Sequence, residues 1–111
     1  MRLKFLILSI LTMVMPSMLF AQASYERIVN ADQEPEHWLT HSGNYASHRH
    51  TTLDQITRDN VDQLKVAWVY QVRRSGFIET TPLVVDGVMY LTEPPSTGAA
   101  LDLRTGRRLW S

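Results

Sequence analysis

Apolar and polar positions follow three successive patterns along the 111 residues. An almost continuous apolar run occupies residues 5–20, directly after Arg2 and Lys4. Residues 24–64 are mostly polar, with isolated apolar positions. From residue 65 onward, short runs of β-branched and aromatic residues alternate with Gly, Pro and Asp. These patterns predict a targeting segment, then short helices and loops, then antiparallel strands.

The first pattern predicts a cleaved secretory signal peptide at residues 1–23. Ala21-Gln22-Ala23 places small residues at the two positions that a signal peptidase reads. The alternative is a transmembrane anchor, which needs about 20 apolar residues. The run here is shorter and contains Pro16. We therefore expect a periplasmic or secreted protein with no membrane span after cleavage.

The second pattern predicts two short helices. Residues 24–32 form the first, with Ser24 as N-cap and with Glu34-Pro35 ending it. Residues 57–64 form the second, a helix of one or two turns capped by Thr57. The polar and aromatic stretch at residues 37–50, between these helices, is expected to be a loop or an irregular edge strand.

The third pattern predicts strands joined by tight turns, with no helix among them. Asp86-Gly87 is the pair that a type I′ hairpin turn prefers, because both central residues need a positive φ. Residues 93–98 contain two prolines and are expected to be a loop. Thr105-Gly106 is expected to be a turn. The predicted strands cover residues 65–72, 82–85, 88–92, 99–103 and 107–110.

The last predicted hairpin carries the spacing A-x-D-x-x-x-G-x-x-x-W, made by Ala100, Asp102, Gly106 and Trp110. A blade of a β-propeller uses such a run to dock onto its neighbour. Asp102 can accept bonds from the turn, and Trp110 offers a flat apolar face to an adjacent blade. The length of residues 65–111 is also close to the roughly 40–50 residues of one four-stranded blade. The alternative is an ordinary Asp/Gly turn before a core Trp.

Composition narrows the range of functions. Lysine and arginine total 11 and so do aspartate and glutamate, which gives no electrostatic reason to expect nucleic acid or an anionic membrane as partner. The chain has no cysteine, so it has neither disulfides nor a C-x-x-C site for zinc or redox chemistry. A single blade depends on its neighbours to bury its apolar faces, so this segment should be weakly stable alone.

Several blocks in the same order resemble the amino terminus of the pyrroloquinoline-quinone (PQQ)-dependent alcohol dehydrogenases, the exported quinoproteins of the methanol, ethanol and glucose dehydrogenase group. The match spans nearly all of the chain after the signal peptide. His50 departs from it, since the family suggests an aromatic residue such as Tyr there. The matching blocks are residues 38–45, Leu53-Asp54-Gln55-Ile56, Asn60-Val61, Leu64, Ala67-Trp68, residues 79–90 and residues 100–110.

The resemblance implies an all-β fold, in which the chain supplies an amino-terminal segment (24–64) and the first blade (65–111) of an eight-bladed propeller. On this basis the chain is expected to be a piece of a longer protein. Part of residues 37–52 is expected to pair with the last blade, since closure removes unpaired strand edges.

The resemblance also implies the chemistry. The quinone, assisted by Ca²⁺ or a lanthanide, accepts a hydride from an alcohol or sugar, and electrons pass to a cytochrome c-type acceptor. Glu79 matches the glutamate that bonds the quinone near its carboxylate edge. The alternative for Glu79 is a solvated residue at a strand edge. Thr80 and Thr81 could orient it, although β-propensity also explains both. The resemblance also implies a catalytic aspartate that removes the hydroxyl proton; this residue and the metal ligands are expected beyond Ser111.

Three other candidates are interpreted as structural. Asp102 is a turn stabiliser and not a catalytic base. Four histidines lie close together, but Pro35 and Gly43-Asn44 oppose the continuous helix that a metal site at this spacing would need, so a solvated loop is favoured. Three arginines near the end are expected on the exposed face of a hairpin. The two sets are His37, His41, His48 and His50, and Arg104, Arg107 and Arg108.

Two further functional hypotheses remain open beside the dehydrogenase. One is a non-enzymatic propeller scaffold of the same repeat type, as in lipoproteins that assist outer-membrane assembly. A lipoprotein needs a cysteine at its cleavage site, and the chain has none. The other is a truncated gene product without activity.

Overall fold

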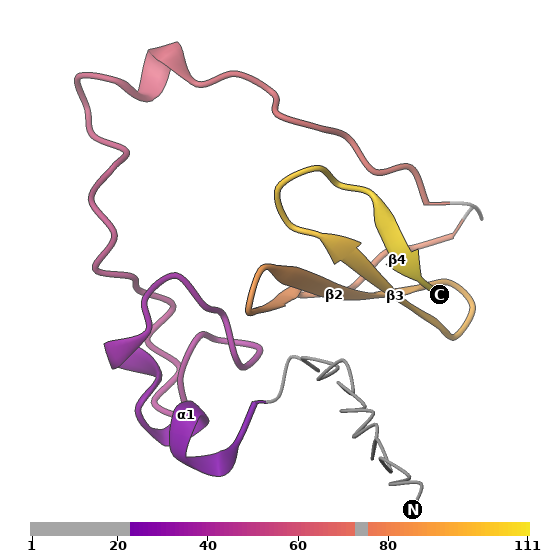
Figure 1. The fold of residues 1–111 in the computed structure, drawn as a ribbon, viewed down its shortest axis with the longest axis horizontal. Helices are drawn as coiled ribbons and strands as arrows, with labels where there is room; N and C mark the ends of the chain where they lie inside the picture. Colours follow the sequence, from indigo (N-terminus) through magenta and orange to yellow (C-terminus); the bar gives the residue numbers. More distant parts are fainter. Residues whose placement is uncertain (1–22, 73–75) are drawn as a thin grey trace, which may run out of the picture.

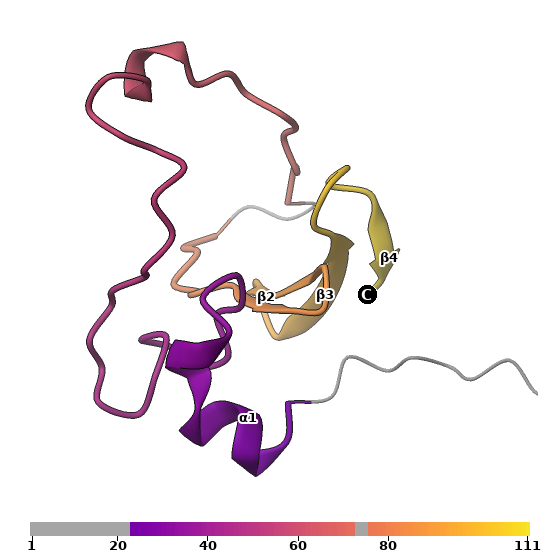
Figure 2. The same ribbon diagram turned by 60° about the vertical axis from the view of Figure 1, so that its left-hand side comes forward.

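The computed structural model describes residues 23–72 and 76–111. An irregular amino-terminal part leads through a long open arc into a small antiparallel sheet, as Figures 1 and 2 show. The predicted signal peptide lies almost entirely outside the described residues. Within the described ranges, no helix is long and apolar enough to cross a membrane.

The carboxy-terminal sheet has four strands, in the order β1-β2-β3-β4. Each strand runs antiparallel to the next, as expected when consecutive strands are joined by tight turns. At the first turn Val85 pairs with Val88, and Asp86 and Gly87 have φ values of 48° and 77°. The predicted turn with two positive φ angles is therefore confirmed. The strands are β1 (Leu83–Val85), β2 (Val88–Glu93), β3 (Thr97–Asp102) and β4 (Arg108–Trp110).

The second turn is tighter than the sequence predicts. We expected a loop over residues 93–98, but Glu93 pairs with Thr97, and only Pro94, Pro95 and Ser96 lie outside the ladder. Proline prevents ladder pairing only where its missing N–H is needed. Here both prolines fall in the turn itself, so β2 and β3 extend up to it.

The strand predicted at residues 65–72 is wrong. This segment joins no ladder in the described part of the chain. Its composition suits a strand, but a strand forms only when another strand pairs with its backbone, and none of the described strands pairs with this segment. From Trp68 onward its side chains still alternate, because Trp68 and Tyr70 are half-buried while Val69 between them is 83% exposed.

Trp68 joins this segment to the turn between β3 and β4. Its indole Nε1 donates to the carbonyl oxygen of Leu103 at 3.0 Å. Its ring lies over Gly106, where an added Cβ would be only 2.5 Å from the Trp68 Cε3 atom. Gly106 also has a φ of 69°, which other residues rarely adopt. Glycine is thus required here both for the turn and for the close approach of the indole.

The first predicted helix forms, and the second is shorter than predicted. Helix α1 (Tyr25–Val29) begins after Ser24, whose Oγ accepts from the backbone N–H of Arg27 at 3.3 Å, and the 3₁₀ turn η1 (Ala31–Gln33) follows. The second is the 3₁₀ turn η2 (Val61–Gln63). Asn60, not Thr57, is the N-cap residue of η2. Thr57 instead closes a local polar turn just before η2, because its N–H donates to the Asn60 side chain at 2.7 Å and its Oγ1 accepts from the Asp59 N–H at 3.3 Å.

One backbone bridge connects the two halves of the chain. Trp38 and Val84 exchange N–H···O bonds of 2.9 and 3.0 Å, so the amino-terminal part extends the sheet beside β1. This bridge reaches the first blade. Pairing of part of residues 37–52 with the last blade of the complete protein stays a prediction. The small core contains Leu101, which is 1% exposed, with Ala31, Leu39, Val85, Ala99 and Ala100.

Candidate functional site

The predicted cofactor residue, Glu79, lies in the segment that leads into β1. Thr80 fixes this segment against β2, because its Oγ1 accepts from the Thr92 N–H at 3.3 Å and from the Thr92 hydroxyl at 3.1 Å. Antiparallel pairing therefore brings the approach to β1 and the turn between β2 and β3 to the same end of the sheet. Thr80 positions the backbone next to Glu79, which adds to its simple β-propensity.

A second contact holds the start of the same segment. Gly76 lies so close to the turn between β2 and β3 that an added Cβ would be 3.0 Å from the Pro94 Cβ atom. Residues 77–79 therefore run between two fixed points, the contact with Pro94 and the Thr80–Thr92 pair.

Glu79 is exposed and has no hydrogen-bond or ion-pair partner among the described residues. Its side chain lines a shallow hollow of about 250 Å³ beside the turn between β2 and β3. Phe77, Glu93, Pro94 and Ser96 also line this hollow. The arrangement offers a free carboxyl group, an exposed aromatic ring and a proline-walled rim to a ligand.

A second carboxylate at this hollow was not predicted. Glu93 is buried, and its Oε1 accepts from the Tyr70 hydroxyl at 2.6 Å. This bond, with desolvation and the charge of Glu93, raises the pKa of Tyr70 above its usual value, while Arg108 acts in the opposite direction. A glutamate followed directly by two prolines, on the strand facing the Glu79 segment, is the sequence signal that could have indicated it.

At the opposite end of β3, Asp102 acts as predicted. Its Oδ1 accepts from the Thr105 N–H at 2.8 Å and from the Thr105 hydroxyl at 2.7 Å. These bonds lower the pKa of the Asp102 carboxyl, as expected for a carboxylate that accepts from donors in a turn. The structural interpretation of Asp102 is confirmed.

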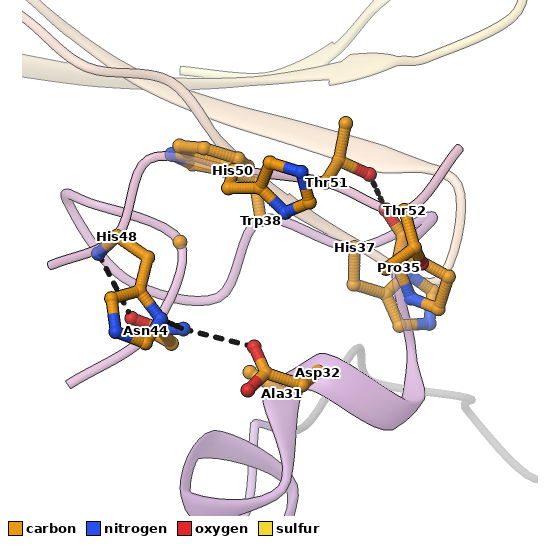
Figure 3. A pocket seen from close by; sticks show the side chains of 11 residues that line it. Ala31, Asp32, Pro35, His37, Trp38, Asn44, His48, His50, Thr51 and Thr52 are labelled. Atoms are coloured by element: carbon orange, nitrogen blue, oxygen red, sulfur yellow. Dashed lines mark hydrogen bonds between the residues drawn. The ribbon is translucent and has the colours of Figure 1, made fainter. Parts of the chain in front are cut away.

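The four histidines do not converge on one point. Figure 3 shows His37 and His48 on opposite sides of a hollow of about 210 Å³. The Asn44 amide links His48 to Asp32, with contacts of 3.1 and 2.9 Å, whereas His41 lies 3.2 Å from an Arg49 nitrogen. Among the described residues no group of three or more His, Cys, Asp or Glu side chains could hold a metal ion.

His37 departs from the predicted solvated loop, because its side chain is only 12% exposed. It belongs to a charged cluster that connects the amino-terminal part to the turn between β1 and β2. Arg27 bonds Glu34 at 2.7 Å and Asp86 at 2.8 Å. His37 Nε2 lies 3.3 Å from a Glu34 oxygen and 3.4 Å from an Asp86 oxygen. The bonds from Arg27 lower the pKa of both carboxyls.

This cluster predicts a pH-dependent attachment of the amino-terminal part. Because the folded pKa values of Glu34 and Asp86 are lowered, their stabilising effect is complete above the usual carboxyl range and is lost as the pH falls through the folded values. We expect hydrogen-exchange protection of the Trp38 and Val84 amides, corrected for intrinsic rates, to decrease between about pH 5 and pH 3.

The variant Arg27→Met tests the origin of that effect. This variant should weaken the hydrogen-exchange protection of the same amides at pH 6, and the protection should depend less on pH than in the parent protein. Arg58→Met alters an exposed arginine that has no hydrogen-bond or ion-pair partner among the described residues; it is the control and should change neither the protection nor its pH dependence. Equal pH profiles for Arg27→Met and the parent protein would show that the cluster does not hold the bridge.

The arginines near the end of the chain are divided between two environments. Arg104 and Arg107 are exposed, as predicted. Arg108, on β4, is half-buried and influences the pKa of Tyr70. Trp110, the final residue of the motif, lies 6.1 Å from the Tyr90 ring and leaves about half of its surface exposed. That exposed apolar surface is available for packing against another blade.

Comparison with known protein families shows which kind of domain the sheet belongs to. Residues 38–111 match the model of the PQQ family, described as the glucose/ethanol/alcohol dehydrogenase β-propeller domain. The chain belongs to this family. The family match covers the bridge at Trp38, the Glu79 hollow and the whole sheet, which is part of a β-propeller blade.

Curated relatives of the PQQ family agree. The chain is 45% identical over 89 residues to the dehydrogenase subunit of a quinone alcohol dehydrogenase from Gluconacetobacter polyoxogenes, covering 80% of the chain and 12% of that protein. It is 49% identical over 74 residues to a 1-butanol dehydrogenase (cytochrome c) from Thauera butanivorans, covering 67% of the chain and 11% of that protein. The chain thus spans about an eighth of the length of such relatives.

Solved structures of PQQ-family enzymes share the fold. The quinohemoprotein alcohol dehydrogenase ADHIIG of Pseudomonas putida HK5 superimposes with a TM-score of 0.78 at 44% identity, over 81% of this chain and 13% of that one. The enzyme from Comamonas testosteroni gives a TM-score of 0.73 at 40% identity, over 81% and 13%. The sequence-based recognition of the family and of the propeller fold is therefore confirmed.

Proposed function

We propose that the complete gene product containing this chain is a periplasmic PQQ-dependent alcohol dehydrogenase, and that this chain contributes Glu79 to its cofactor site. One observation carries the proposal. In a blade of this family, an exposed glutamate lines a hollow at the end of the sheet and has no partner within residues 23–72 and 76–111. Charged groups are seldom left unpaired when a blade is buried among its neighbours, so a polar ligand is expected at this position.

The residues at the hollow suit a planar, polar cofactor. Glu79 would bond the edge of the quinone, and the Thr80–Thr92 pair holds the backbone from which Glu79 projects. A carboxyl group beside an anionic cofactor needs an intervening donor or a raised pKa. The exposed position of Glu79 leaves room for such a donor from another blade. When bound, the quinone supplies the hydride acceptor for oxidation of the alcohol.

The remaining parts of the site are proposed to come from elsewhere in the complete protein. These are the catalytic base, the ligands of the Ca²⁺ or lanthanide ion and a route for electrons to a cytochrome c-type acceptor. The name of the Thauera butanivorans relative, a 1-butanol dehydrogenase (cytochrome c), supports that type of acceptor. An alcohol or a sugar is the proposed substrate class.

The test is turnover by the complete gene product, isolated from the periplasm and loaded with PQQ and Ca²⁺ or a lanthanide. We expect alcohol-dependent reduction of an artificial electron acceptor that is absent without PQQ. A folded, PQQ-loaded product that oxidises no member of a panel of primary alcohols and aldose sugars would favour the alternatives, a non-enzymatic propeller scaffold or an inactive product.

A further inference from the structure

Phe77 is the most exposed large apolar side chain in residues 23–72 and 76–111, at 96%. It lies on the approach to β1, two residues before Glu79. Single exposed apolar residues are common on protein surfaces, so exposure alone carries no argument. Phe77 differs from such residues because its backbone is held in place and because Glu79 lies beside it.

The backbone around Phe77 is held on both sides. Gly76 lies against the Pro94 ring, and Thr80 bonds both the backbone and the side chain of Thr92. These contacts attach residues 77–79 to the end of β2 and to the turn that follows it. Phe77 is thus presented from a fixed part of the sheet end, and presenting it to a ligand would cost little additional ordering.

Phe77 and Glu79 line the same hollow, together with Ile78 between them. An exposed aromatic ring and a carboxyl group with no partner among the described residues are therefore presented to one hollow. If Phe77 were only packed beneath a neighbouring blade, Glu79 would be buried there too and would need a donor from that blade, since burying an unpaired carboxylate is costly. A planar aromatic ligand with polar edges satisfies both side chains at once.

We propose that Phe77 is a second cofactor contact, which supplies an apolar contact to the quinone rings beside the polar contact of Glu79. This inference rests on the proposed function, since it assumes that the hollow receives the quinone. It assigns to this chain a pair of cofactor residues, one apolar and one polar, on a single segment. Phe77 should therefore affect retention of the cofactor and leave the stability of the cofactor-free protein unchanged.

The experiment is a PQQ titration of the cofactor-free complete gene product at fixed Ca²⁺, followed by quenching of protein fluorescence. For Phe77→Ala we expect the Kd for PQQ to rise about tenfold, from the loss of an aromatic contact and its buried area. Phe77→Leu keeps apolar volume without the ring, so its Kd for PQQ should lie between those of the parent protein and Phe77→Ala. Val69→Ala removes another strongly exposed apolar side chain outside the hollow and is the matched control. The thermal midpoint of each cofactor-free variant is measured in parallel.

The outcomes separate this inference from the proposed function. An unchanged Kd in Phe77→Ala, with a weakened Kd in Glu79→Ala, overturns the role of Phe77 and leaves the cofactor site in place. A lower thermal midpoint with an unchanged Kd overturns it too, since Phe77 would then only pack against protein. If Phe77→Ala does not fold, the Kd for PQQ and the thermal midpoint of Phe77→Leu and Phe77→Tyr are compared with those of the parent protein in the same way. No PQQ binding by the folded parent protein overturns the proposed function itself.

Discussion

Replacing Gly106 by alanine is expected to destabilise the blade by about 2–5 kcal/mol, combining strain at a positive φ with overpacking. The new Cβ would meet the Trp68 ring at 2.5 Å, and the φ of 69° is unfavourable for alanine. The indole cannot simply move away, because its Nε1 is bonded to the Leu103 carbonyl. The measurement is the loss of hydrogen-exchange protection at β3 and β4 in the complete gene product.

Gly87 supplies a matched control for Gly106. Its φ is 77°, close to that of Gly106, but apart from its two neighbours in the chain no described residue has an atom within 4 Å of its added Cβ. Gly87→Ala should therefore show only the backbone strain, about 1 kcal/mol or somewhat more. Combining Gly106→Ala with Trp68→Ala should remove the clash, so that the two changes together cost less than their sum. Equal losses for Gly87→Ala and Gly106→Ala would contradict the packing of Trp68 on this turn.

The second large effect is expected at Glu79. Glu79→Ala should weaken PQQ binding by about 10- to 100-fold, the equivalent of losing one hydrogen bond to a charged group, about 1.5–3 kcal/mol. Glu79→Gln keeps a polar group of the same size, so it should weaken PQQ binding less than Glu79→Ala does. The measurement is the Kd for PQQ of the cofactor-free complete gene product at fixed Ca²⁺.

Glu36→Ala is the control for Glu79, since Glu36 is also exposed and lies in the amino-terminal part, away from the hollow. Its Kd for PQQ should match that of the parent protein. A Glu79→Ala variant that binds PQQ as tightly as Glu36→Ala would show that Glu79 is a solvated residue at the sheet end, which is the alternative that the sequence left open.

The elements best predicted from the sequence are those whose determinants are local. The turn at Asp86-Gly87 forms because two successive residues there must take positive φ values. The bonds from Thr105 to Asp102 and the cap at Ser24 likewise involve residues only three positions apart. Such contacts depend little on the rest of the chain, so sequence alone was sufficient to predict them.

The largest errors of prediction concern contacts between residues that are distant in the sequence. Residues 65–72 have the composition of a strand but no strand beside them in the described part of the chain. The bonds of Arg27 to Asp86 and of Tyr70 to Glu93 join residues 59 and 23 positions apart. No local pattern indicates which distant charge an arginine will meet. The candidate site shows the same division, since Glu79 came from a family resemblance while Phe77 and Glu93 required the fold.

The most direct test of the central claim, that this chain supplies a blade whose Glu79 holds the quinone, is a crystal structure of the complete gene product with PQQ bound. We expect a Glu79 carboxylate oxygen within about 2.5–3.2 Å of a polar atom of the cofactor or of a single bridging donor. A quinone bound elsewhere in the molecule, with Glu79 in solvent or paired only with protein, would contradict the account.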